Sequence, residues 1–228
     1  MTGFCCRLFM LKESVKRSRV YAALCKARLY YWNRRAMRAW ARAGRPVPPP
    51  HKFKQETVKS YARKFGLDVL VETGTFQGDM IEATRSHFRE IYSVELGEEL
   101  HRAACLKFAR YKHVHLFRGD SAAVLRELLP KLNRPPLIWL DAHYSGGITV
   151  KGYSDTPVIG ELHVVLDWEQ MSPVILIDDA RCFDGTNGYP TIEAVREMIL
   201  YERPDWIFEV RDDIIRAHAP QAGPRDDP

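Results

Sequence analysis

The chain has 228 residues, a net charge of +5 and a hydrophobic content of 46%, which suit a soluble protein with a substantial core. No apolar run approaches the roughly 20 residues that span a bilayer. The five cysteines are scattered without a Cys-x-x-Cys pair, which argues against a zinc or thioredoxin-like motif and predicts free thiols in a reducing, cytoplasmic compartment.

The charge is unevenly distributed along the chain. Residues 1–50 hold twelve Lys or Arg and one acid, a net charge of +11, which leaves −6 for the remainder. The basic character therefore belongs to the N-terminal segment, and the mildly acidic body argues against a nucleic-acid partner.

Residues 1–45 carry apolar side chains at alternating spacings of three and four, which predicts a basic amphipathic helix or helical pair. Three interpretations compete. The helix could pack on the body or on a second subunit of a homo-oligomer such as a dimer, it could make a peripheral contact with a membrane surface, or it could be a transit peptide. The scarcity of Ser and Thr argues against the third.

A proline-rich segment at 46–50 predicts a stiff, extended linker and marks a domain boundary. We expect the main domain to cover 51–218 and the last residues, 219–228, to form a disordered tail.

Helical and strand patterns alternate after the linker, which predicts a doubly wound α/β fold with a mostly parallel sheet. The chain ends in two short strands joined at Asp212 and Asp213, which predicts an antiparallel hairpin. The expected helices cover 55–65, 79–87, 98–110, 121–129, 157–168 and 191–202. The expected strands cover 68–73, 90–95, 114–118, 137–141, 173–178, 206–211 and 214–218.

A glycine bend follows the first expected strand. An apolar, β-branched run ends at Glu72, and Gly74 and Gly78 follow as a helical pattern begins. Such a bend lets the backbone approach a ligand closely at the carboxyl end of a parallel sheet. The spacing Glu-x-Gly-x-x-x-Gly differs from the dinucleotide fingerprint Gly-x-Gly-x-x-Gly, which argues against a plain NAD-binding dehydrogenase.

Further acids stand at the ends of the expected strands, where open α/β sheets bind their ligands. Glu95 lies about 20 residues beyond the bend, the separation at which such folds place an acid on ribose hydroxyls. Asp120 follows the third strand, although it could equally cap the helix that starts beside it.

These marks together resemble the class I S-adenosylmethionine-dependent methyltransferases over roughly residues 68–141. The resemblance implies a Rossmann-like, seven-stranded sheet with an antiparallel C-terminal hairpin, here with an added N-terminal helical extension. It implies S-adenosylmethionine as cofactor, with Glu72 facing its amino group, Glu95 its ribose and Asp120 its adenine. The residues expected at the cofactor are Glu72, Gly74, Thr75, Gly78, Glu95, Asp120, Ser121 and Asp141.

The fourth and fifth strands also end in acids, Asp141 and the pair Asp178–Asp179. If these strands are neighbours, three carboxylates converge and a hard cation such as Mg²⁺ would neutralise them. This arrangement resembles the metal-dependent O-methyltransferases, and most of all the macrocin O-methyltransferase group, which implies that the three acids are metal ligands. Alternatively, Asp178 faces cofactor or substrate, and Asp179 caps a helix or pairs with Arg181.

His143 follows Asp141 by two residues in a loop, and its imidazole could take a proton from an acceptor hydroxyl as general base. His143 and Asp141 form the expected catalytic pair. The alternative is that His143 is a structural loop histidine. The loop that contains it has no assignable counterpart in the metal-dependent enzymes.

The sequence therefore predicts an enzyme that methylates a hydroxyl of a small-molecule or glycan-like acceptor, with Mg²⁺ as a candidate aid. One alternative is a hydroxylase or oxidoreductase with a carboxylate–histidine metal site on the same scaffold. A second is a non-catalytic scaffold protein, which the strand-end acids argue against.

Overall fold

A computed structural model describes residues 19–141 and 157–221, and the chain divides into two compact units, Met1–Phe53 and Lys54–Pro228. The division falls a few residues beyond the proline-rich segment. Within the described ranges, no helix combines the length and hydrophobicity needed to cross a membrane.

The described part of the first unit contains one long helix, α2 (Arg19–Arg42). Its end is fixed by Trp40, which is buried, packs on Phe53 at a ring separation of 4.7 Å and donates to the Pro46 carbonyl at 2.7 Å. The expected helix in the basic segment is therefore present over 19–42, whereas its first 18 residues lie outside the described ranges.

The second unit is built on a seven-stranded sheet with the order β3-β2-β1-β4-β5-β7-β6. Five strands run parallel, and β7 lies antiparallel between β5 and β6. The predicted doubly wound sheet with a closing hairpin is confirmed. The strands are β1 Val69–Thr73, β2 Glu90–Glu95, β3 Val114–Arg118, β4 Leu137–Leu140, β5 Val174–Ile177, β6 Ile207–Arg211 and β7 Ile214–His218.

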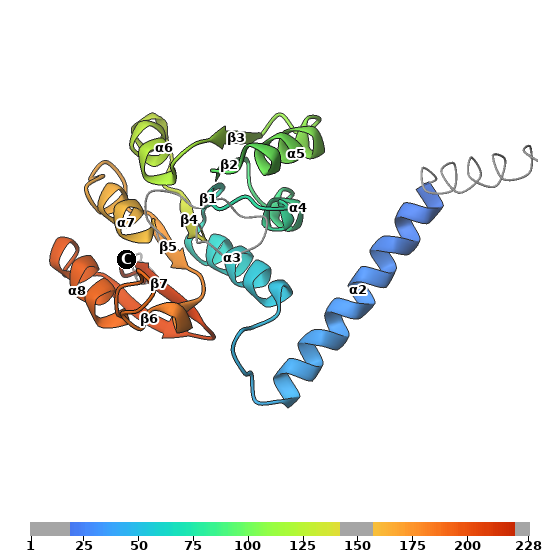
Figure 1. Cartoon of the computed structure of the whole chain (residues 1–228), viewed down its shortest axis with the longest axis horizontal. Coiled ribbons are helices and arrows are strands. Elements are labelled where there is room, and N and C mark those ends of the chain that lie inside the picture. Colours follow the sequence, from blue (N-terminus) through green and yellow to red (C-terminus); the bar gives the residue numbers. More distant parts are fainter. Residues whose placement is uncertain (1–18, 142–156, 222–228) are drawn as a thin grey trace, which may run out of the picture. The chain divides into compact units, whose positions relative to one another are not determined.

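Helices cover both faces of this sheet (Figure 1). They are α3 His51–Phe65, α4 Asp79–Thr84 and α5 Glu98–Phe108 toward one side, and α6 Ser121–Leu128, α7 Val158–Leu166 and α8 Ile192–Glu202 toward the other. Successive side chains of a strand point to opposite faces. Val69 and Val71 accordingly join the core under α6, α7 and α8, and Leu70 and Glu72 face the other layer.

Two helix bounds differ from the sequence prediction by three residues or more, for local reasons. Helix α3 begins at His51, four residues earlier than expected, because the Pro50 carbonyl accepts the Phe53 N–H at 2.8 Å and the helix starts directly at the end of the proline segment. Helix α4 ends early at Thr84, whose hydroxyl bonds the Met80 carbonyl at 2.7 Å, an interaction that competes with the regular helical pattern.

The closing hairpin turns at Asp212 and Asp213, which both have positive φ, 49° and 64°. A turn with two left-handed residues matches the twist of an antiparallel ribbon, and Asp tolerates this conformation better than most residues. The turn brings Asp213, which is buried, back toward the chain that leaves β5.

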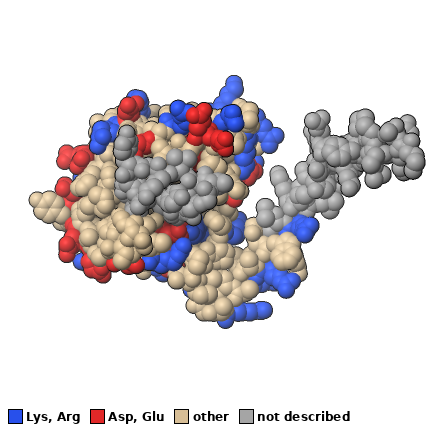
Figure 2. Space-filling view, viewed as in Figure 1, with Lys and Arg blue, Asp and Glu red and all other residues tan. Residues whose placement is uncertain are grey.

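Charged side chains of both signs alternate over the described surface of the second unit on the face shown in Figure 2. No continuous basic patch forms there among the described residues. The sequence beyond residue 50 has a net charge of −6, so the basic excess of the chain lies in the N-terminal segment.

Candidate functional site

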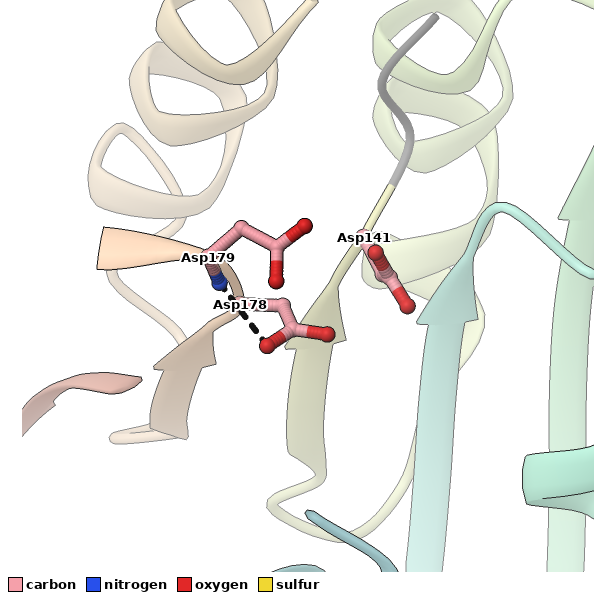
Figure 3. Close-up of side chains that lie close together, drawn as sticks. All are labelled: Asp141, Asp178 and Asp179. Carbon is pink, nitrogen blue, oxygen red and sulfur yellow. Dashed lines mark hydrogen bonds between the residues drawn. The ribbon is translucent and has the colours of Figure 1, made fainter. Parts of the chain in front are cut away.

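The acids predicted at the fourth and fifth strands do converge. Asp141, Asp178 and Asp179 each offer an oxygen, and these atoms lie within 4.8 Å of one another (Figure 3). The ladder is extended past both strands, because the Asp141 N–H donates to the Thr73 carbonyl at 3.2 Å and the Asp178 N–H donates to the Leu140 carbonyl at 3.0 Å. Neighbouring parallel strands thus fix where the acids stand.

The glycine bend lies at the same edge, after β1. The N–H groups of Gly74 and Thr75 both donate to the Val94 carbonyl, at 3.0 and 3.1 Å, so the bend is tied to β2. Gly78 opens α4 with a φ of 72°, and a Cβ there would lie 2.5 Å from the ring of Phe108. Glycine at 78 is therefore required by both backbone conformation and packing.

Glu72 ends β1 as a buried carboxyl group, 2% exposed. Its Oε2 is 2.6 Å from the Ser93 hydroxyl, which is in turn 2.6 Å from the Thr75 hydroxyl. Burial raises the pKa of Glu72 to about 8, the Ser93 hydrogen bond opposes this, and the charges of Asp141 and Glu95 add to it. Glu72 is an acid held mostly protonated near neutral pH by its surroundings.

Glu95, the predicted ribose ligand, bonds to the loop that contains the glycine bend. One carboxylate oxygen accepts the Phe76 N–H and the other accepts the Gly97 N–H, both at 2.8 Å. These bonds fix the loop after β1 beside the loop after β2. Each oxygen keeps further acceptor capacity, so a bound diol remains compatible with this geometry.

Asp120 and Ser121 begin α6 after β3. The Asp120 side chain accepts the Ala123 N–H at 3.0 Å, so its role as a helix cap is present in the structure. Buried beside Ser121 is Glu161 of α7, which sequence reasoning did not identify. Burial raises the pKa of Glu161 to about 7, while the nearby hydroxyls of Ser121 and Thr73 oppose the rise.

Lys54 on α3 is the main functional candidate that the sequence analysis missed. Its ammonium lies 2.6 Å from Asp178 Oδ2 and 2.8 Å from Asp179 Oδ1, and the residue is only 7% exposed. One signal was available: Lys54 precedes the buried Val58 by four residues and Ala62 by eight. It therefore stands on the apolar stripe of the helix, where a lysine needs a partner.

Arg181 provides a second cation at the same oxygen of Asp179. Its Nη1 is 2.8 Å from Asp179 Oδ1 and also binds Asp213, whose Oδ1 accepts the Arg181 backbone N–H at 2.8 Å. Asp179 itself is left-handed, with φ 54°, and its N–H bonds Asp178 Oδ1 at 2.8 Å, as Figure 3 shows. The alternative in which Asp179 pairs with Arg181 is thus observed.

The charged groups of this cluster shift one another's pKa. Burial alone would lower the pKa of Lys54, but the charge of Asp178 and hydrogen bonds to both aspartates hold it above the usual range. Burial and the charge of Asp141 raise the pKa of Asp178, which the Lys54 ammonium opposes. The distances of 2.6 and 2.8 Å indicate a charged lysine bound by two carboxylates.

The cluster offers carboxylate oxygens, which are the ligands that Mg²⁺ prefers. Oxygens of Asp178 and Asp179, however, already bind protein cations. Lys54 bonds an oxygen of Asp178, and Lys54 and Arg181 share an oxygen of Asp179. A metal would have to share both aspartates of the pair with these protein cations, so the residues as they stand do not form a ready metal site.

The predicted base His143 and the rest of its loop, 142–156, lie outside the described residues. The catalytic pairing of His143 with Asp141 therefore stays a prediction.

No family model and no curated protein matches the sequence. The fold, however, is similar to solved structures. An O-methyltransferase from Bacillus cereus in complex with SAH is 15% identical, with a TM-score of 0.55, over 82% of this chain and 90% of that one. The O-methyltransferase TomG from Streptomyces achromogenes in complex with SAM is also 15% identical, with a TM-score of 0.55, over 81% and 87%.

A putative caffeoyl-CoA O-methyltransferase from Staphylococcus aureus is 14% identical, with a TM-score of 0.55, and the match covers 86% of this chain and all of that one. At such low identity the likeness establishes the fold alone. That fold is the class I methyltransferase fold, as the resemblance in the sequence implied.

Proposed function

We propose that this chain is an S-adenosylmethionine-dependent methyltransferase that acts on a hydroxyl of a small-molecule or glycan-like acceptor. The observation that carries the proposal is the row of acids at the carboxyl edge of a sheet with this topology. Carboxylates and hydroxyls suit a cationic ligand with a ribose diol, whereas the pyrophosphate of a dinucleotide would meet repulsion there.

The half of the edge formed by β1, β2 and β3 would hold the cofactor. S-adenosylmethionine, when bound, supplies an electrophilic methyl group on a sulfonium. Glu72 would offer its carboxyl group to the amino group of the ligand and release its proton on binding, since its pKa is about 8 in the free protein. Glu95 would accept from the ribose, and its bonds to Phe76 and Gly97 keep it in place.

The half formed by β4 and β5 would receive the acceptor. Asp141 follows β4 beside the Glu72 end of β1, so the acceptor hydroxyl and the methyl group would meet between the two halves. Catalysis would come mainly from holding the two reactants in line and excluding water. His143 stays the candidate base that removes the hydroxyl proton.

Calorimetry with S-adenosylmethionine and S-adenosylhomocysteine tests the cofactor assignment directly. We expect one site in the wild type, and a loss of at least about tenfold in affinity in Glu95→Gln, which corresponds to one charge-assisted hydrogen bond. Glu90→Gln is the matched control, because Glu90 starts the same strand and pairs with His115 at 2.7 Å. Absence of binding to the wild type would overturn the assignment.

The same titration gives a second readout at the Glu72 half. Because Glu72 is protonated in the free protein below about pH 8, binding of a cationic amino group should release a proton and tighten as pH rises from 6 to 8. Heats measured in buffers of different ionisation enthalpy should therefore differ in the wild type and converge in Glu72→Gln.

A further inference from the structure

We propose that the cation of the Asp141–Asp178–Asp179 cluster is the Lys54 ammonium, and that this chain works without the divalent metal that such a cluster would otherwise bind. The inference concerns the acceptor half of the proposed function and rests on it for its catalytic meaning. Its structural content, which cation occupies the cluster, is independent of any activity.

The first argument is the position of the ammonium. Lys54 Nζ lies within 2.8 Å of oxygens from both Asp178 and Asp179. These are two of the three groups that could ligate a metal. A protein side chain therefore already provides positive charge where a metal would have to bind.

The second argument is how firmly Lys54 is held. The residue is delivered by a helix whose inward face is buried at Val58, Tyr61 and Ala62. Its own side chain is only 9% exposed. A metal at the two oxygens that Lys54 occupies could bind only if a buried ammonium gave up two charged hydrogen bonds, and breaking such a pair leaves uncompensated charge.

The third argument is that the remaining charge of Asp179 is also shared within the protein. Arg181 bonds the same Asp179 oxygen as Lys54, and Asp213 fixes the arginine through its side chain and its backbone N–H. One oxygen of Asp179 thus binds two cations of the protein, which reduces the attraction of this carboxylate for a third.

An ammonium has three N–H donors, and the two aspartates take two of them. Under the proposed function, the Lys54 charge beside the aspartates would stabilise an acceptor oxygen that loses its proton there, which is the role of a preorganised electrostatic group.

The test is a titration with Mn²⁺ alone, followed by electron paramagnetic resonance on the full chain without any cofactor. We expect no saturable site in the wild type up to about 1 mM, the weak limit of dedicated oxygen-ligand sites. Lys54→Met should gain a site at least about tenfold tighter. The matched control is Lys59→Met, on the same helix and similarly buried, whose partner is Glu56.

A saturable site in the wild type that Asp178→Asn removes would overturn the proposal. So would a Lys54→Met variant that folds yet gains no site, or a Lys59→Met control that gains the same one. Lys54→Gln, which keeps a donor, is the second variant if Lys54→Met loses its near-ultraviolet circular dichroism.

A parallel measurement keeps the two proposals apart. S-adenosylmethionine binding and any methyl transfer by the wild type should be indifferent to EDTA and to added Mg²⁺. If S-adenosylmethionine does not bind at all, the proposed function fails while the Mn²⁺ result still decides which cation occupies the cluster.

Discussion

The two halves of the carboxyl edge compensate their acids in different ways. At β1 and β2, Glu72 and Glu95 are bound by hydroxyls and backbone N–H groups, and neither forms an ion pair among the described residues. At β4 and β5, Asp178 and Asp179 are bound by buried or half-buried cations, Lys54 and Arg181. Carboxyl groups thus stand in two electrostatic environments on the two sides of the β1–β4 pair.

The difference indicates which half can take up external charge. Among the described residues, Glu72 and Glu95 accept from neutral donors only, so a positively charged ligand improves the electrostatics of this half. The second half already contains its cations, so it suits a neutral group such as a hydroxyl. This division agrees with a cationic cofactor on one side and an uncharged acceptor on the other.

The largest effect is expected where a fixed cation is removed. Lys54→Met leaves buried carboxylates without their partner, and we expect unfolding free energy to fall by about 3 kcal/mol or more. Lys59→Met should cost less than about 1 kcal/mol, because the side chain of its partner Glu56 is 45% exposed and water can solvate the carboxylate once the lysine is gone. Urea titration of both variants measures the difference. Equal losses would show that Lys54 is held by packing rather than by the aspartates.

A pH-dependent effect is expected in the half without cations. The pKa of Glu72 is raised from about 4.5 to about 8 on folding, so its stabilising contribution is complete below pH 4.5 and is lost as pH rises toward 8. Relative to Glu72→Gln, the wild type should lose roughly 3 kcal/mol between pH 5 and pH 8. Parallel stability curves for the two proteins over that range would contradict this.

The smallest effect separates structure from ligand binding at Asp120. Loss of the α6 cap in Asp120→Ala should cost about 1 kcal/mol, as should Thr191→Ala, which removes the equivalent cap of α8. Asp120→Asn should keep most of that stability. If Asp120→Asn still weakens S-adenosylmethionine binding while Thr191→Ala does not, the carboxylate has a role beyond the cap. Thermal unfolding and calorimetry provide both readouts.

Much of this architecture could be predicted because most strands of the sheet correspond to apolar runs in the sequence. The runs ending at Glu72, Glu95 and Asp141 are bounded by acids and turns, and a parallel sheet brings such ends to one edge. The convergence of Asp178 and Asp179 with Asp141 was expected only if the fourth and fifth strands are neighbours, and the pairing of β4 with β5 meets that condition.

Lys54 could not be predicted by the same reasoning. Four lysines lie in α3, and their partners are determined by tertiary packing rather than by local pattern. The helix expected over 55–65 also began one residue after Lys54, so Lys54 fell outside the predicted helix. The hydrogen bonds of Glu95 to Phe76 and Gly97 could not be predicted for a related reason. Their donors are backbone N–H groups, which nearly every residue type has.

The hairpin turn at Asp213 has a consequence for how the protein is made. The acceptor half joins Lys54 to Asp178 across 124 residues, and Arg181 to Asp213 across a further 32. Contacts of such long sequence separation form late, and the chain leaves the ribosome from its N-terminus. We therefore expect nascent chains that stop before β7 to contain a partly formed sheet whose cluster lacks the Asp213 contact that fixes Arg181.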